Sequence, residues 1–156
     1  MINLKQILVP TDFSAASDSA LRYGKALAET FGSTLHLLHV VEETPVYPWA
    51  SPEGILPLPL PAWDELRQHV HAQLSKQLTE AEQRLFHAEV ATLPGSPFVE
   101  IVRYAKTHAI DLIVIGTHGR GPVAHMLLGS VAEKVVRKTP CPVLTVRSPE
   151  HEFVLP

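Results

Sequence analysis

The chain has 156 residues, a length typical of one domain of ~100–200 residues. Hydrophobic residues make up 46% and charged residues 19%, a composition that belongs to a globular protein and not to a disordered tail. The net charge of −3 argues against a dedicated nucleic-acid binder, because such proteins gather lysine and arginine against phosphates.

The cysteine content and the hydropathy of the sequence indicate the cellular compartment in which the protein is expected. Cys141 is the only cysteine, so an intrachain disulfide is excluded and nothing indicates an oxidising environment. No stretch approaches the ~18 consecutive apolar residues of a membrane helix. The first six residues lack the charged and apolar blocks of a signal peptide. We therefore expect a soluble cytoplasmic protein with no membrane partner.

The first elements predicted are a strand, a helix and a strand. Residues 7–9 (ILV) predict a buried strand that ends in a turn at 10–12 (PTD). Apolar residues at helical spacing then predict a helix from Ser14 to Phe31, stopped by Gly32. Residues 34–41 (TLHLLHVV) predict the second strand. Such a βαβ unit implies parallel strands and a right-handed crossover.

A proline-rich stretch interrupts this alternation. Six of the 14 prolines fall within residues 45–61. Proline removes a backbone donor and fixes φ, so neither a helix nor a central strand persists there. The stretch predicts a long loop inserted within a single domain, 1–156. It is either a flap folded back over the domain or a lid or contact surface, since loops beyond ~12–15 residues are often functional.

The second half of the chain continues the alternation of strands and helices. An apolar stripe predicts one long helix over residues 64–85, and Ser130 to Glu133 has the pattern of a capping box, which starts the last helix at Ser130. A further helix begins near Phe98. Further strands are predicted at 89–93, 111–115 and 142–146. Five strands alternating with four helices indicate a doubly wound α/β domain.

Glycine is concentrated late in the chain, where the backbone must turn sharply or approach something closely. Standard phosphate motifs fail there, because Pro122 and Val123 stand where a Walker loop requires Lys and Ser or Thr. These glycines are either turn and cap residues only or part of an anion site. Four of the eight glycines fall within 14 residues: Gly116, Gly119, Gly121 and Gly129.

The spacing that remains, Gly116-x-x-Gly119 followed after nine residues by Gly129 and Ser130, suits a phosphate. A helix start exposes unpaired N–H groups and a partial positive charge, and Arg120 would add a charged donor.

In an open parallel sheet, ligands bind beyond the carboxyl ends of strands where the winding direction switches. If strands 7–9 and 111–115 are neighbours at that switch, Asp12 faces the same crevice. There it either accepts hydrogen bonds from ribose hydroxyls or caps the following helix.

Four stretches together are similar to one protein family: residues 7–14 (ILVPTDFS), 38–40 (LHV), 116–130 and 140–144 (PCPVL). They resemble the first strand and turn, the end of the second strand, the G-2x-G-9x-G-(S/T) nucleotide motif and the final strand of universal stress proteins of the ATP-binding subgroup. The likeness covers residues 3–147, and the proline-rich stretch at 45–61 departs from the pattern.

The resemblance implies a Rossmann-like, five-stranded parallel sheet of order 3-2-1-4-5 with helices on both faces. It implies ATP as the ligand, with Mg or Mn, and a homodimer formed through the last strand, 142–146. That strand is an apolar edge, which left bare is an aggregation hazard. The nucleotide-binding residues that the resemblance implies are Pro10, Thr11, Asp12, Val40, Gly116, Thr117, His118, Gly119, Arg120, Gly129, Ser130 and Val131.

The nine histidines form no metal-binding motif. His69 and His71 are two apart on a predicted helix and point in different directions, while His36 and His39 lie on opposite faces of a predicted strand. No zinc site is therefore expected. His118 differs, because it lies inside the glycine-rich loop, where it either contacts phosphate or is solvated.

We expect a cytoplasmic, homodimeric stress-response or regulatory module that binds ATP, with slow or no hydrolysis. No Walker lysine is present, and only Asp12 and His118 offer a general base. Two alternatives stay open. The first is a nucleotide hydrolase or nucleotidyl transferase of the same fold. The second is a nucleotide-independent, dimeric interaction protein in which the glycines are structural.

Overall fold

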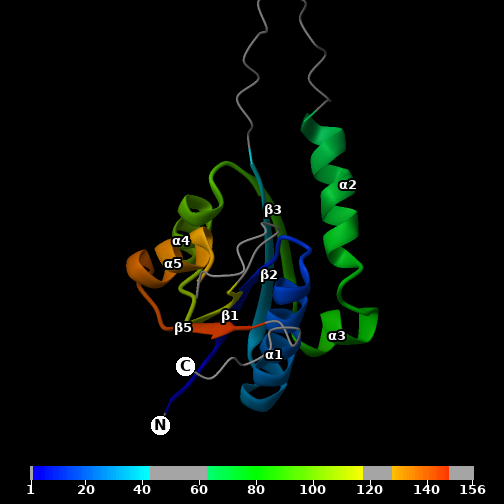
Figure 1. Ribbon diagram of the computed structural model, residues 1–156. Helices are drawn as coiled ribbons and strands as arrows, with labels where there is room; N and C mark the ends of the chain where they lie inside the picture. Colours follow the sequence, from blue (N-terminus) through cyan, green and yellow to red (C-terminus); the bar gives the residue numbers. More distant parts are fainter. Residues whose placement is uncertain (1, 43–62, 118–127, 148–156) are drawn as a thin grey trace, which may run out of the picture.

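A five-stranded parallel sheet carries the fold in the computed structural model, which describes residues 2–42, 63–117 and 128–147 (Figure 1). The strand order is β3-β2-β1-β4-β5, which confirms the predicted order. The winding direction switches between β1 and β4, the neighbours that the sequence analysis required. The strands are β1 (Gln6–Pro10), β2 (Thr34–Val41), β3 (Glu89–Pro94), β4 (Leu112–Gly116) and β5 (Val143–Val146).

Two hydrophobic cores lie on the two faces of this sheet. Ile7 and Val9 of β1 pack into one core and Leu8 packs into the other, because successive side chains of a strand point to opposite faces. All three side chains are fully buried, as expected of a central parallel strand covered by helices on both sides. The predicted layer structure is confirmed.

Helix α1 (Ala15–Phe31) begins and ends where the sequence predicts. The Ser14 hydroxyl accepts a hydrogen bond from the backbone N–H of Ser17, which satisfies one of the free donors at the helix start. Gly32 ends the helix in the left-handed conformation, with φ +63°, which glycine adopts without steric cost. The helix packs on the face of the sheet that holds Ile7 and Val9.

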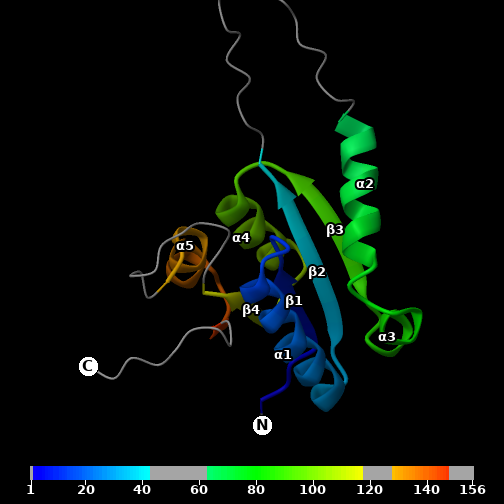
Figure 2. The same cartoon turned by 45° about the vertical axis from the view of Figure 1, so that its right-hand side comes forward.

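The single helix predicted over residues 64–85 is wrong: the chain forms α2 (Trp63–Ser75) and α3 (Glu80–Leu85). Thr79 starts α3 with a capping box, in which Thr79 and Glu82 satisfy each other's backbone donors. The apolar stripe ran through this restart unchanged, but Leu78 is buried whereas Leu85 is 60% exposed. Figure 2 shows α2 alongside β3.

The opposite face is covered by α4 (Pro97–Thr107) and α5 (Ser130–Lys138) (Figure 1). The predicted capping box at Ser130 is wrong, because the N-cap of α5 is Gly129 and no side chain caps the helix. Glu133 is then one position too far along to reach the cap. Its carboxylate instead pairs with Arg137 at 2.9 Å. Among the helices that the structure describes, none is long and apolar enough to cross a membrane.

Polar side chains fasten the amino ends of the central strands. Asp111 Oδ2, just before β4, accepts hydrogen bonds from the backbone N–H groups of Lys5 and Gln6 at 2.7 and 2.9 Å. The Ser33 hydroxyl, just before β2, donates to the carbonyl of Leu4 at 2.6 Å. The start of β1 is thereby bonded to the starts of both neighbouring strands.

Two sets of predicted features lie outside the described residues. They are the proline-rich stretch at 45–61 and three motif positions, His118, Gly119 and Arg120. Their roles stay predictions.

Candidate functional site

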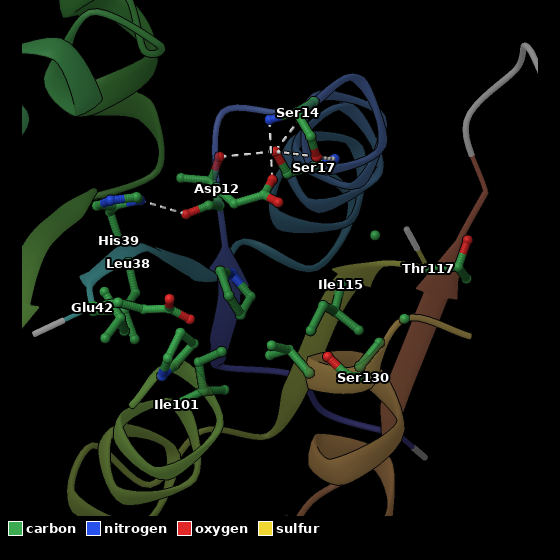
Figure 3. A pocket seen from close by; sticks show the side chains of 18 of the residues that line it. Asp12, Ser14, Ser17, Leu38, His39, Glu42, Ile101, Ile115, Thr117 and Ser130 are labelled. Atoms are coloured by element: carbon green, nitrogen blue, oxygen red, sulfur yellow. Dashed lines mark hydrogen bonds between the residues drawn. The ribbon is translucent and has the colours of Figure 1, made fainter. Parts of the chain in front are cut away.

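A cavity of about 560 Å³ lies at the carboxyl ends of β1, β2 and β4, where the winding direction switches (Figure 3). This volume is within the ~300–1,000 Å³ usual for small-molecule sites, and the position is where open α/β sheets bind their ligands. Nine of the twelve residues predicted to bind a nucleotide line it: Pro10, Thr11, Asp12, Val40, Gly116, Thr117, Gly129, Ser130 and Val131.

The turn from β1 into α1 forms one wall of the cavity and is held by its own hydrogen bonds. Asp12 Oδ1 accepts from the backbone N–H of Ser14 at 3.0 Å. The Thr11 hydroxyl accepts from the N–H of Phe13 at 3.1 Å and donates to Ser17 Oγ at 3.0 Å. Of the two roles considered for Asp12, the helix-entry contact is therefore present. The half-buried carboxylate also lines the cavity.

Gly116 has a packing role that its sequence spacing did not reveal. A Cβ at this position would lie 2.7 Å from the carbonyl carbon of Ala16 and 2.9 Å from the N of Ser17. Contacts below 3.0 Å are essentially never seen for a real Cβ. Only glycine lets the end of β4 meet the first turn of α1, whatever occupies the cavity.

Backbone hydrogen bonds bring the start of α5 to the end of β4. The N–H of Thr117 donates to the carbonyl of Val146 at 2.9 Å, and the N–H of Gly129 donates to the carbonyl of Thr117. Gly129 has φ −65° and ψ 155°, so its conformation does not require glycine. The first turn of α5 therefore faces the cavity with its N–H groups, the positive end of the helix dipole.

The β2 wall contains cavity residues that the sequence analysis missed, His39 and Glu42 among them. His39 Nδ1 donates to the carbonyl of Thr11 at 2.8 Å, and its ring packs on Phe13 with 4.7 Å between centroids. The period-2 alternation that places Leu38 and Val40 on one face would also have placed Glu42 there. Pro97 and Ile101 of α4 were missed too, because helix residues distant in sequence carry no local signal of a site.

Among the described residues, the cavity is lined by two carboxylates, those of Asp12 and Glu42, which are too few for a metal cage. Within residues 2–42, 63–117 and 128–147, no group of three His, Cys, Asp or Glu side chains is placed to hold an ion. A nucleotide's divalent cation takes oxygen ligands mainly from phosphates and water, with one or two carboxylates. Asp12 is a cavity carboxylate able to contribute in that way.

Comparison with known proteins gives one consistent family. The model of the Universal stress protein family matches residues 3–147. A universal stress protein of Methanocaldococcus jannaschii, MJ0531, is 34% identical over 148 residues, covering 95% of this chain and 85% of that protein. The solved structure of UspA from Lactobacillus plantarum has a TM-score of 0.67 at 27% identity, covering 94% of this chain and 100% of that chain.

Two further universal stress proteins with this fold were solved as nucleotide complexes. One, in complex with cAMP, has a TM-score of 0.64 at 20% identity, and covers 94% of this chain and 99% of that one. The other, from Archaeoglobus fulgidus in complex with dAMP, has a TM-score of 0.52 at 22% identity with the same coverage. At these identities the likeness establishes the shared fold.

Proposed function

The chain belongs to the universal stress protein family, and on that premise we propose that its cavity binds an adenine nucleotide, with ATP as the expected ligand. The observation that carries the proposal is that the two ends of the cavity differ in charge: one is negative and the other is partly positive. The carboxylates of Asp12 and Glu42 line the β1 and β2 side, and the N-terminus of α5 lines the other. Such a cavity suits a ligand with hydrogen-bond donors at one end and anionic groups at the other.

The strand order supports one orientation of the nucleotide. From β2 through β1 to β4 there are two strand spacings of ~4.8 Å, roughly 10 Å in all, which is the scale of a nucleoside and its first phosphates. Leu38, Val40 and Ile101 offer apolar surface for the base beside β2. Asp12, at the end of β1, is then positioned to accept hydrogen bonds from ribose hydroxyls.

The phosphates are assigned to the start of α5. The backbone N–H groups of Ser130 and Val131, in the first turn of α5, are donors that a helix leaves unpaired, and the helix dipole favours an anion there. His118, Gly119 and Arg120 are proposed to close over the same phosphates, with Mg²⁺ or Mn²⁺ bound to the nucleotide. The solved complexes with cAMP and dAMP, in proteins of this fold, support the choice of adenine.

Binding rather than rapid turnover is the proposed activity. The sequence lacks the lysine with which Walker loops neutralise charge developing on the γ-phosphate. We place the protein in the cytoplasm as a regulatory module of the stress response. It is proposed to act as a homodimer through β5, an edge strand on which Leu144 is 37% exposed.

Isothermal titration calorimetry with ATP, GTP and AMP tests the proposal. The wild type is expected to bind ATP, and Asp12→Asn is expected to bind it about tenfold more weakly, the loss typical of one hydrogen bond to a charged group. In this variant the side-chain carbonyl still accepts from the N–H of Ser14. Asp18→Asn, an equal charge change on the exposed side of α1, should leave the affinity unchanged.

Two results would replace the proposal. If no nucleotide binds, the dimeric interaction protein remains. If the purified protein turns ATP over rapidly and Asp12→Ala abolishes that turnover, the chain is a nucleotide hydrolase or transferase of the same fold.

A further inference from the structure

Glu42 continues the row of side chains that forms the apolar side of the cavity. Leu38 and Val40 are 1% and 9% exposed and pack in the same core as Ile101 of α4. Because side chains alternate along an extended chain, the residue after β2 at position 42 falls in line with them. Figure 3 shows the Glu42 side chain directed into the cavity, which Ile101 also lines.

Within the part of the chain that the structure describes, no partner explains this orientation. Among the described residues, no hydrogen bond or ion pair involves the Glu42 carboxylate. Apolar residues of the same cavity lining include Leu38, Pro97 and Ile101. A carboxylate is an acceptor only, so a ligand that fills this part of the cavity gains by presenting an N–H donor to it.

We infer that Glu42 is the residue that selects the base, by accepting a hydrogen bond from the exocyclic amino group of adenine. The inference rests on the proposed function and adds the preferred base class, a 6-aminopurine. The strand order supports this role over a ribose contact, since Asp12 at the end of β1 lies between Glu42, the residue after β2, and the start of α5. A negative group is also tolerated best at the end of the cavity farthest from the phosphates.

The matched ligand pair is ATP and purine riboside 5′-triphosphate, which lacks only the 6-amino group. The wild type is expected to bind ATP about tenfold more tightly than this analogue, the effect of one hydrogen bond to a charged group. In Glu42→Ala the two affinities should become equal. Glu42→Gln keeps a carbonyl acceptor and should retain part of the preference. Removing the negative charge changes the affinity for both triphosphates alike, so the ratio of the two dissociation constants isolates the hydrogen bond.

Glu29→Gln is the control, because Glu29 is exposed on α1 and does not line the cavity. It should keep the wild-type ratio. The inference is overturned if Glu42→Ala keeps that ratio, or if the wild type binds ATP and the analogue equally. It is also overturned if the wild type prefers GTP and loses that preference in Glu42→Ala, which would assign Glu42 to the N–H donors of guanine. If the wild type binds no nucleotide at all, the proposed function fails and this inference fails with it.

Discussion

The hydroxyl of Tyr104 lies 3.0 Å from Nδ1 of the buried His36 and donates a hydrogen bond to it. The side-chain oxygen Oε1 of Gln6, 2.7 Å from Nε2, can only accept, so Nε2 holds the proton and the imidazole is neutral. Burial lowers the pKa of His36, and Glu89, whose carboxylate is 3.5 Å from Nδ1, opposes that shift. His108, stacked on Tyr104, lowers the pKa further.

The stability of the protein should therefore decrease on mild acidification, and His36→Gln should reduce that dependence. Since the pKa of His36 is lower in the folded than in the unfolded chain, the unfolded chain takes up the proton first. Stability is then lost as the pH falls from ~6.5 towards the folded value. One proton limits the slope to about 1.4 kcal/mol per pH unit. Urea denaturation of both proteins between roughly pH 5 and 7.5 measures the difference. His69→Gln, on the exposed side of α2, should follow the wild type, and equal slopes for His36→Gln and the wild type would contradict the assignment.

Replacing Tyr104 by phenylalanine should cost about 1–3 kcal/mol of unfolding free energy, because Nδ1 of the buried His36 loses its donor. Burial raises the pKa of Tyr104 to about 12, so the hydroxyl remains a donor throughout the neutral range. Tyr23→Phe removes the same atom from a residue that is 57% exposed and should change stability by less than about 0.5 kcal/mol. Denaturant titration of the two variants compares them directly; equal losses would mean that the hydrogen bond to His36 contributes nothing.

Gly116→Ala should destabilise the fold by about 1–3 kcal/mol and weaken nucleotide binding as well. The added methyl group collides with the backbone of Ala16, so the first turn of α1 must move away from the cavity wall. Gly32→Ala is the matched control. Gly32 has φ +63° with open space around it, so alanine there costs backbone strain without moving the cavity. Thermal unfolding together with ATP titration separates the variants, and unaltered ATP affinity in a folded Gly116→Ala would show that the α1 turn is not part of the site.

A proline at position 145 should convert the proposed dimer into a monomer. The carbonyls of Pro142 and Val146 accept hydrogen bonds from the β4 side. Backbone groups alternate in direction along a strand, so Thr145 presents its N–H to the open edge. Thr145→Pro removes that donor and Thr145→Ser keeps it. Light scattering after size-exclusion chromatography should report half the wild-type mass for the proline variant alone; an unchanged mass would place the interface elsewhere.

The parts of the fold that the sequence predicted are those in which one local pattern decides the outcome. The apolar run at Ile7 to Val9, which ends at a proline turn, predicted a buried strand, and Ser14 and Gly32 mark the ends of α1 by local backbone chemistry. The break between α2 and α3 was missed because the stripe of leucines persists across it. The capping box at Thr79 was a readable signal, but the buried position of Leu78 depends on the packed core.

The sequence predicted some residues of the candidate site and missed others, because contacts between residues far apart in the chain leave no local pattern. Gly116 was singled out by its spacing and lines the cavity, but its contact with Ala16 joins residues a hundred positions apart and has no local signature. Glu42 was overlooked because it follows its strand by one position. Its alternation with Val40 becomes meaningful only once that face of the strand is known to border a cavity.

The bonds of Asp111 and Ser33 to the entry of β1 lie at one end of the sheet, and the proposed ligand lies at the other. Evolution can therefore tune resistance to unfolding at one end without altering what the other end recognises. Random mutagenesis should separate two classes of substitution. Those that lower the melting temperature should cluster at the residues before the strands. Those that abolish ligand binding without changing the melting temperature should cluster at the residues after the strands.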